Sequence, residues 1–194
     1  VGTQFLSIPH NAMELIIGAN PVLINKTTKP VLSASYGVWL AGIKVSSFGY
    51  NRSAFGGTAG FDVRYIALND LELRPDRPTD DPLTVFSATA IALDGNYIRQ
   101  TKFGMLNAKL RYISMQLLDE SAAGFAMDIG LQHNLNDKLN VGFSLLNIGS
   151  MSELYRERPK LPVRFITGAS YVFNFNEIDN TIFIALEKSS MTEG

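Results

Sequence analysis

The sequence contains no cysteine, which excludes disulfide frameworks, thiol catalysis and cysteine-based metal sites. Charge is also scarce, since charged residues make up 18% of the chain and hydrophobic residues 46%. A soluble surface of this size usually carries more charge, so we expect something other than water to cover part of it. The net charge is -1 and no basic run occurs, which argues against nucleic acid as a partner and against a polybasic lipid-binding segment.

Long apolar runs are absent as well. A transmembrane helix needs about 18 to 20 largely apolar residues in succession, and the best candidate, residues 12–24, is interrupted by Glu14, Asn20 and Pro21. The sequence therefore excludes a membrane-spanning helix. If this chain crosses a membrane, it must do so with strands.

Catalytic and metal-binding patterns are equally sparse. His10 and His133 are the only histidines, and we expect both in loops or turns rather than at a metal. An acyl hydrolase could pair His133 with Ser144, but the chain has no Gly-x-Ser-x-Gly motif. The glycine-rich residues 56–60 lack the lysine of a phosphate loop. The mixed charges of residues 70–81 favour a solvated loop over a cation site. We therefore expect that the protein is not an enzyme and that it binds no cofactor.

What the sequence does contain is a series of strand-like segments rich in Val, Ile, Phe and Tyr, separated by Gly, Asn, Asp and Pro. We expect nine strands, at 31–38, 42–51, 57–68, 84–99, 103–117, 122–134, 139–148, 162–175 and 181–188. Short turns at one end of these strands alternate with connections at the other end that include long polar loops at 69–83 and 149–161. That alternation is typical of an up-and-down membrane barrel.

Within the segments, apolar residues alternate with small or charged ones. Residues 122–134 place Phe125 and Ile129 on one face and Asp128 on the other, because successive side chains of a strand point in opposite directions. A soluble sandwich or a lipocalin-like barrel would show the same alternation, with its apolar face as the core. Aromatic residues near the strand ends are candidates for the girdles of a membrane barrel: Tyr36, Trp39, Tyr50, Tyr171 and Phe175.

The polar face of a barrel would line its interior. The alternation predicts an inward-facing set with almost equal numbers of positive and negative charges, which favours a salt-bridged interior over an ion-selective pore. Its members are Lys44, Asp62, Arg64, Asp94, Lys109, Arg111, Asp128, Arg164 and Glu187. Of these we expect Lys109, Arg111 and Asp128 to lie close enough to pair across adjacent strands.

Several short phrases, in this order and spacing, resemble the PorV/PorQ family of outer-membrane barrels. The first is the Gln-Phe-Leu-Ser-Ile segment at 4–8, followed by a small-residue stretch ending at Ala19 and by Asn20-Pro21. Later phrases are Gly-Thr-Ala-Gly at 57–60 followed by Arg-Tyr at 64–65, Ala-Met-Asp-Ile-Gly-Leu at 126–131, Leu-Asn-Ile-Gly at 146–149 and Leu-Pro at 161–162. The chain departs from the family in two ways: the segment before Asn20 is much shorter, and Val22 replaces an alanine.

The resemblance implies an all-β, antiparallel, FadL-like transmembrane barrel of about fourteen strands in the outer membrane of a Gram-negative bacterium. It implies a role in protein export or surface attachment through the type IX secretion system, with membrane lipid, secretion-system proteins and secreted cargo as partners. The alternative within the superfamily is a FadL-like transporter for hydrophobic small molecules. Residues 1–30 would form a plug-like segment that contains Asn20 and Pro21, and residues 31–194 the barrel strands.

Nine strands are an odd number, whereas bacterial single-chain barrels have an even number and closed walls. We therefore expect the chain to be an incomplete portion of the barrel, with the outer edge of segment 181–188 unpaired. A closed barrel of about eight strands is the alternative if residues 31–51 form one long strand.

Overall fold

The computed structural model describes residues 29–38, 42–74, 81–175 and 178–190 of the chain. These residues form one antiparallel sheet of nine strands in which every strand pairs with its neighbours in the sequence. The all-β, up-and-down arrangement predicted from the sequence is thereby confirmed. The strands are β1 (Val31–Val38), β2 (Lys44–Ala54), β3 (Gly57–Leu73), β4 (Thr84–Thr101), β5 (Gly104–Leu117), β6 (Glu120–Asn134), β7 (Leu139–Met151), β8 (Arg164–Phe175) and β9 (Ile178–Ser189).

Most strand boundaries agree with the predicted ones to within three residues, and β3 is the main exception. It continues to Leu73, five residues beyond the predicted end at Leu68. The extension passes an irregularity in which Asn69 and Asp70 lie opposite Ser87 alone, with Asp70 at a φ of 58°. The extra residue interrupts the alternation of apolar and polar side chains. The sequence pattern therefore predicted a loop for the polar residues beyond it.

The alternative of a single strand over 31–51 is wrong. β1 and β2 are separate strands that pair from Val31↔Asn51 to Val38↔Lys44. Connections between later strands follow the predicted alternation of length. Turns at 55–56, 102–103 and 135–138 lie at one end of the sheet, which we call the short-turn end. Longer connections at 74–83 and 152–163 lie at the opposite end, the long-loop end.

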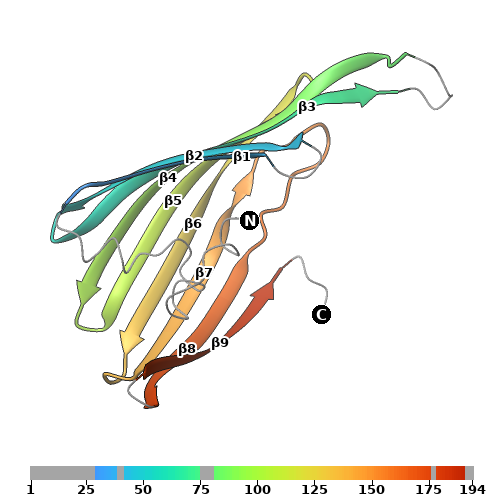
Figure 1. The fold of residues 1–194 in the computed structure, drawn as a ribbon. Coiled ribbons are helices and arrows are strands. Elements are labelled where there is room, and N and C mark those ends of the chain that lie inside the picture. The colour runs from blue at the N-terminus through green and yellow to red at the C-terminus, as the bar shows by residue number, and fades with distance from the viewer. Residues whose placement is uncertain (1–28, 39–41, 75–80, 176–177, 191–194) are drawn as a thin grey trace.

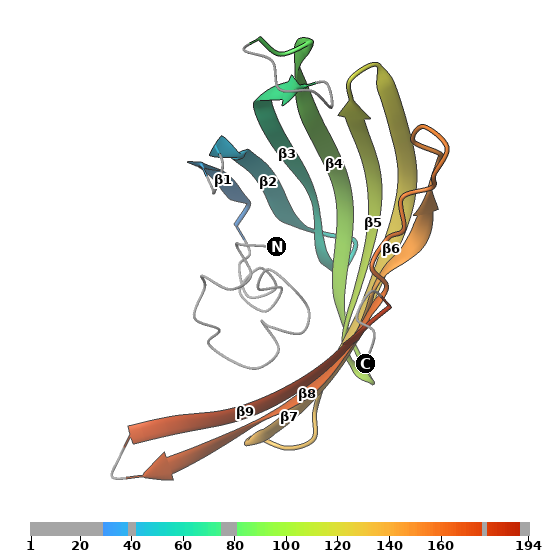
Figure 2. The same cartoon turned by 90° about the vertical axis from the view of Figure 1, so that its right-hand side faces the viewer.

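The sheet curves into an open trough (Figures 1 and 2). β1 and β9 form its two edges, and within the described residues they do not pair with each other. The sheet is therefore not closed into a barrel. No helix in the described part of the chain is long and apolar enough to cross a bilayer.

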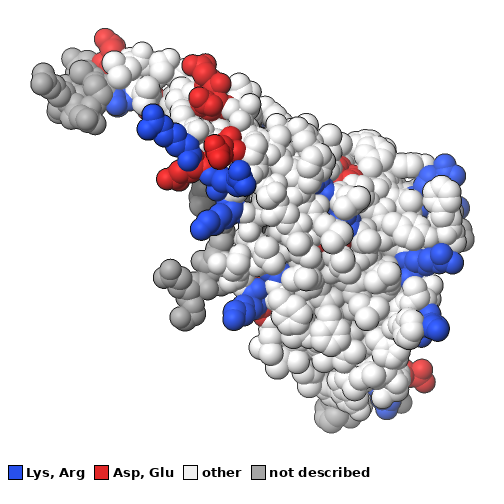
Figure 3. Space-filling view, turned by 180° about the vertical axis from the view of Figure 1, so that it is seen from behind, with Lys and Arg blue, Asp and Glu red and all other residues white. Residues whose placement is uncertain are grey.

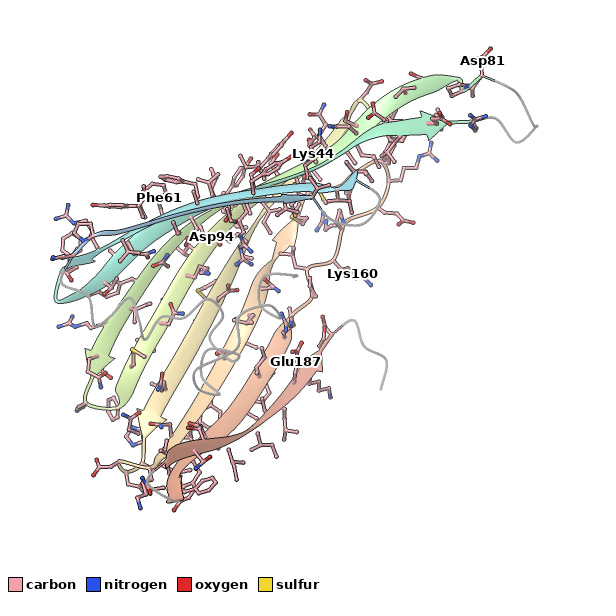
Figure 4. All side chains as sticks on the ribbon, in the orientation of Figure 1. Lys44, Phe61, Asp81, Asp94, Lys160 and Glu187 are labelled. Carbon is pink, nitrogen blue, oxygen red and sulfur yellow. The ribbon has the colours of Figure 1, made fainter. Side chains whose placement is uncertain are left out.

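The convex and concave faces of the trough differ in chemistry, and β6 shows the difference clearly. On the convex face, Phe125 and Ile129 are 69% and 39% exposed, whereas Ala126 and Asp128 on the concave face are 3% and 8% exposed. The register carries the same division across the neighbouring strands. Figure 4 shows Phe61 on the convex side and Asp94 on the concave side.

The convex face is an extended apolar surface. Its exposed large apolar residues are Leu32, Tyr36, Val38, Phe48, Phe61, Tyr65, Leu93, Leu106, Leu110, Phe125, Met127, Ile129, Phe143, Leu145, Phe165, Tyr171, Ile182, Ile184 and Leu186. Seen from this side, the middle of the molecule is mostly white, and charged side chains gather towards the ends of the strands (Figure 3). An apolar face of this extent is not expected in contact with water.

Candidate functional site: a polar network on the concave face

The register brings the inward-facing charged residues of five strands together. Asp62 of β3 lies opposite Asp94 of β4, which lies opposite Arg111 of β5. Lys109 of β5 is the direct neighbour of Asp128 in β6. All of these positions, together with Arg64 and Arg164, lie on the concave face. This is the face that the alternation pattern predicted as the inward one.

Lys44 is the one member of the predicted inward set that is placed wrongly. It lies opposite Val38 and Ala67, and it therefore shares the convex face with Phe48. Lys44 precedes Phe48 by four residues in the same strand, so the two side chains share a face, whereas Ser47 faces inward. The lysine is accommodated there because it begins the strand, at the long-loop end of the apolar surface.

Asp94 is the centre of the network. Its side chain is 1% exposed, and its carboxylate accepts hydrogen bonds from Arg64 Nη2 at 2.6 Å and from Arg111 Nε at 2.7 Å. Lys109 Nζ lies 3.9 Å from the same carboxylate. A buried carboxylate is tolerated when charged donors surround it, and here three cations on two neighbouring strands do so.

A second carboxylate, Asp128, joins the network to a β-bulge in β7. Leu146 and Asn147 both lie opposite Asp128, so β7 carries one extra residue here, and Asn147 has a φ of 59°. Asp128 Oδ1 accepts the backbone N–H of Asn147 at 2.7 Å, and its Oδ2 lies 3.2 Å from Arg111 Nη2. The carboxylate thus satisfies a backbone donor that the bulge removes from the strand ladder.

The Asn147 side chain extends the network in both directions. Its Oδ1 accepts from Arg111 Nη1 at 2.7 Å, and its Nδ2 donates to the Pro162 carbonyl at 3.0 Å. The bulge therefore ties β5 and β6 to the segment that leads into β8. The sequence pattern placed Asn147 at the border of a loop. The inward-facing Asp128 on the neighbouring strand could have indicated this contact.

Two further pairs complete the polar face. Asn96 Nδ2 donates to Asp62 Oδ2 at 2.9 Å. The Arg164 guanidinium binds both oxygens of Glu187 across β8 and β9, at 2.5 and 2.7 Å. Of the two predicted partners of Asp128, Arg111 forms the pair, whereas Lys109 is paired with Asp94 instead.

The network is electrically balanced. Arg64, Lys109 and Arg111 are matched by three aspartates, Asp62, Asp94 and Asp128. A wall that selects ions by charge would present an excess of one sign. The network joins strands β3 to β7 through hydrogen bonds and ion pairs between side chains of the concave face.

Beside the ion pairs, the concave face carries buried oxygen atoms with no hydrogen-bond partner among the described residues. They are Asn51 Oδ1, Asn96 Oδ1, Asn107 Oδ1, Gln132 Oε1, Ser144 Oγ and Ser170 Oγ. All six belong to inward positions by the register. These oxygen atoms are further hydrogen-bond acceptors on the concave face, in addition to the carboxylates of the ion pairs.

Towards the long-loop end, the concave face becomes apolar. A row of directly paired residues crosses β2 to β6 there: Val45, Ile66, Ala90, Met115 and Ala122. Ile66 is 44% exposed although it lies on this face. The inner side of the sheet therefore has an apolar zone next to the charged network.

Other predicted site residues are not brought together. His133 lies in β6 rather than in a turn, on the convex face, whereas Ser144 in β7 is on the concave face, so the sheet separates them. His10, Asn20 and Pro21 lie outside the described residues. Within the described residues, no three His, Asp or Glu side chains form a group that could hold a metal ion.

Comparison with known proteins gives no relative: no protein-family model, no curated protein and no solved structure matches the chain.

Proposed function

We propose that this chain forms part of the wall of a non-enzymatic outer-membrane β-barrel. One observation carries the proposal: the convex face is apolar and exposed (Figure 3), whereas the concave face carries the charged network and the buried polar side chains. A transmembrane barrel needs this inversion, because lipid surrounds its outer face and polar side chains fill its interior. A soluble sandwich needs the opposite, with the apolar face covered by a second sheet.

The edges of the sheet support a larger wall. Among the described residues, β1 and β9 have no outer partner strand, and in a bilayer each unpaired backbone group at an edge is costly. We propose that further strands complete a FadL-like barrel of about fourteen strands, with the short-turn end on the periplasmic side.

For the role of this barrel we propose protein export and surface attachment of the PorV/PorQ type, through the type IX secretion system. The order of sequence phrases supports this assignment, and one of those phrases contains Asp128, a member of the network. The balanced network also supports a filled, non-selective interior over an ion pore.

A FadL-like conduit for hydrophobic small molecules is the second candidate. The apolar row on the concave face supports it, because an exposed side chain such as Ile66 would contact an apolar ligand inside the barrel. In that case the charged network would form the floor of the apolar zone.

The first experiment tests the membrane wall. Cells that produce the protein are fractionated, and the detergent-extracted outer membrane is run on a gel with and without heating. We expect the protein in that fraction, with a mobility that changes on heating. A protein recovered in the aqueous fraction without detergent would contradict the proposal.

The second experiment separates the two roles. The coding sequence is deleted in the source bacterium, and secreted proteins with a C-terminal sorting domain are followed by immunoblotting, together with uptake of a long-chain fatty acid. The export role predicts that cargo accumulates in the periplasm while uptake is unchanged. Lost uptake with normal secretion would favour the conduit.

A further inference from the structure

At the short-turn end, the convex face carries a cluster of basic and aromatic residues that the network does not explain. Arg52 and Arg99 are exposed on the convex side of β2 and β4, and Lys102 is exposed in the next turn. Figure 3 shows Lys and Arg side chains gathered at this end of the molecule. The three cations come from two separate hairpins, so the sequence shows no basic run here.

No acidic partner of these cations lies among the described residues. Neither arginine forms an ion pair with a described carboxylate, and Lys102 Nζ instead lies 4.9 Å from the centre of the Phe103 ring. Elsewhere in the sheet, the cations Arg64, Arg111 and Arg164 are paired with carboxylates. At the short-turn end, the convex surface therefore gathers three cations that no described carboxylate neutralises.

A pocket lies within this cluster, between β4 and β5. It has a volume of about 420 Å³, and Tyr97, Arg99, Gln100, Thr101, Leu106 and Ala108 line it. Tyr97 is held in place because its hydroxyl donates to the Phe55 carbonyl at 2.7 Å. The pocket thus combines a guanidinium and hydroxyl groups with an apolar wall.

Two exposed aromatic rings flank the pocket. Phe55 is 88% exposed in the turn between β2 and β3, and Phe103 is 65% exposed in the turn between β4 and β5. Towards the middle of the strands the surface becomes purely apolar at Leu106 and Leu110. Aromatic and basic residues next to an apolar band are typical of the level at which lipid headgroups lie.

We propose that this cluster binds the headgroup of an anionic glycerophospholipid in the leaflet at the short-turn end. Arg99 contacts the phosphate in the pocket, and Arg52 and Lys102 add positive charge around it. The acyl chains lie along Leu106 and Leu110. This inference rests on the proposed membrane location, since a lipid reaches the site only if the convex face lies in a bilayer.

The test uses the full chain, purified in detergent and titrated with phosphatidylglycerol or phosphatidylcholine of the same acyl chains. Native mass spectrometry counts the lipids retained. We expect phosphatidylglycerol to be retained at least fivefold more strongly, because each cation near a headgroup contributes about a factor of five. Arg99→Gln should lower that preference about fivefold, because it removes one of the three cations.

Lys138→Gln is the matched control, because it removes the same charge from another turn at the same end, outside the pocket. Its preference should equal that of the wild type. Equal retention of the two lipids by the wild type, or an unchanged preference in Arg99→Gln, would overturn the inference. Release of the retained phosphatidylglycerol by millimolar glycerol phosphate would also overturn it, because the site would then take a soluble phosphate.

The heating gel distinguishes this failure from failure of the proposed function. A protein in the outer membrane with heat-dependent mobility and no lipid preference contradicts only the lipid site. A protein that needs no detergent contradicts both. The variants must keep the heat-dependent mobility, which shows that their wall is folded.

Discussion

The carboxylate of Asp128 accepts the backbone N–H of Asn147 at the point where β7 carries one residue more than β6. The same carboxylate binds Arg111, so a local irregularity of the strand is connected to the largest charged cluster of the sheet. The bulge and the network therefore depend on one side chain.

Replacing Asp128 should destabilise the sheet. Asp128→Ala leaves the Asn147 amide and one Arg111 contact without an acceptor, and we expect a loss of about 2–4 kcal/mol in the free energy of unfolding. Asp128→Asn keeps an oxygen for the amide, while Arg111 keeps Asp94, so it should cost about 1 kcal/mol. Urea unfolding in lipid vesicles measures both.

Asp119→Ala is the control for that series, because Asp119 is exposed in the turn between β5 and β6. It should change the unfolding free energy by less than about 0.5 kcal/mol. Equal losses for Asp128→Ala and Asp128→Asn would contradict the role assigned to the backbone contact.

A charge on the convex face tests the membrane location. Ile129→Arg introduces a cation in the middle of the apolar surface and should cost about 2–4 kcal/mol in vesicles. Ser121→Arg lies on the same face near the end of the same strand and should cost less than about 1 kcal/mol. Similar losses for the two variants would show that position 129 is not at the middle of a bilayer.

Cysteine labelling tests the same face without a charge. The chain has no cysteine, so Ile129→Cys and Ala126→Cys each provide a single thiol. A maleimide that partitions into lipid should label position 129 and spare position 126, which is buried on the concave face. Labelling confined to position 126 would reverse the assignment of the two faces.

Gly149 should not tolerate a side chain. A Cβ atom at this position would collide with the Phe125 carbonyl and the Ala126 backbone, which cannot move as a side chain can. We expect Gly149→Ala to lower the unfolding free energy by about 1–3 kcal/mol. Gly95→Ala is the control, since nothing lies within 4 Å of its Cβ position. Comparable effects at the two positions, measured by urea unfolding, would contradict the close approach.

The strand set was largely predictable, because alternation persists over most of each segment. Val31–Val38 was predicted with both boundaries correct, and β6 with its two faces. What alternation cannot reveal is an inserted residue. At Asp70 and Asn147 a bulge adds one residue, so the two-residue alternation is interrupted although the strand continues.

The network was predictable in its members and less so in its contacts. The pattern assigned Asp94 and Arg111 to one face, but it could not indicate which of two carboxylates Lys109 would approach. Asn147 was missed because asparagine followed by Ile-Gly is typical of a turn. The basic cluster around Arg99 was missed because it forms only when two turns meet in space.

If the proposed membrane wall is correct, the edges that β1 and β9 leave unpaired within the described residues have a consequence for the kinetics of insertion. Hydrocarbon cannot hydrogen-bond to an exposed edge, so entry into the bilayer and pairing of both edges must occur in one step. If strands of the same polypeptide pair with the edges, the insertion rate is independent of protein concentration. If strands of another chain do so, the rate rises with concentration, so the reaction order of insertion distinguishes the two arrangements.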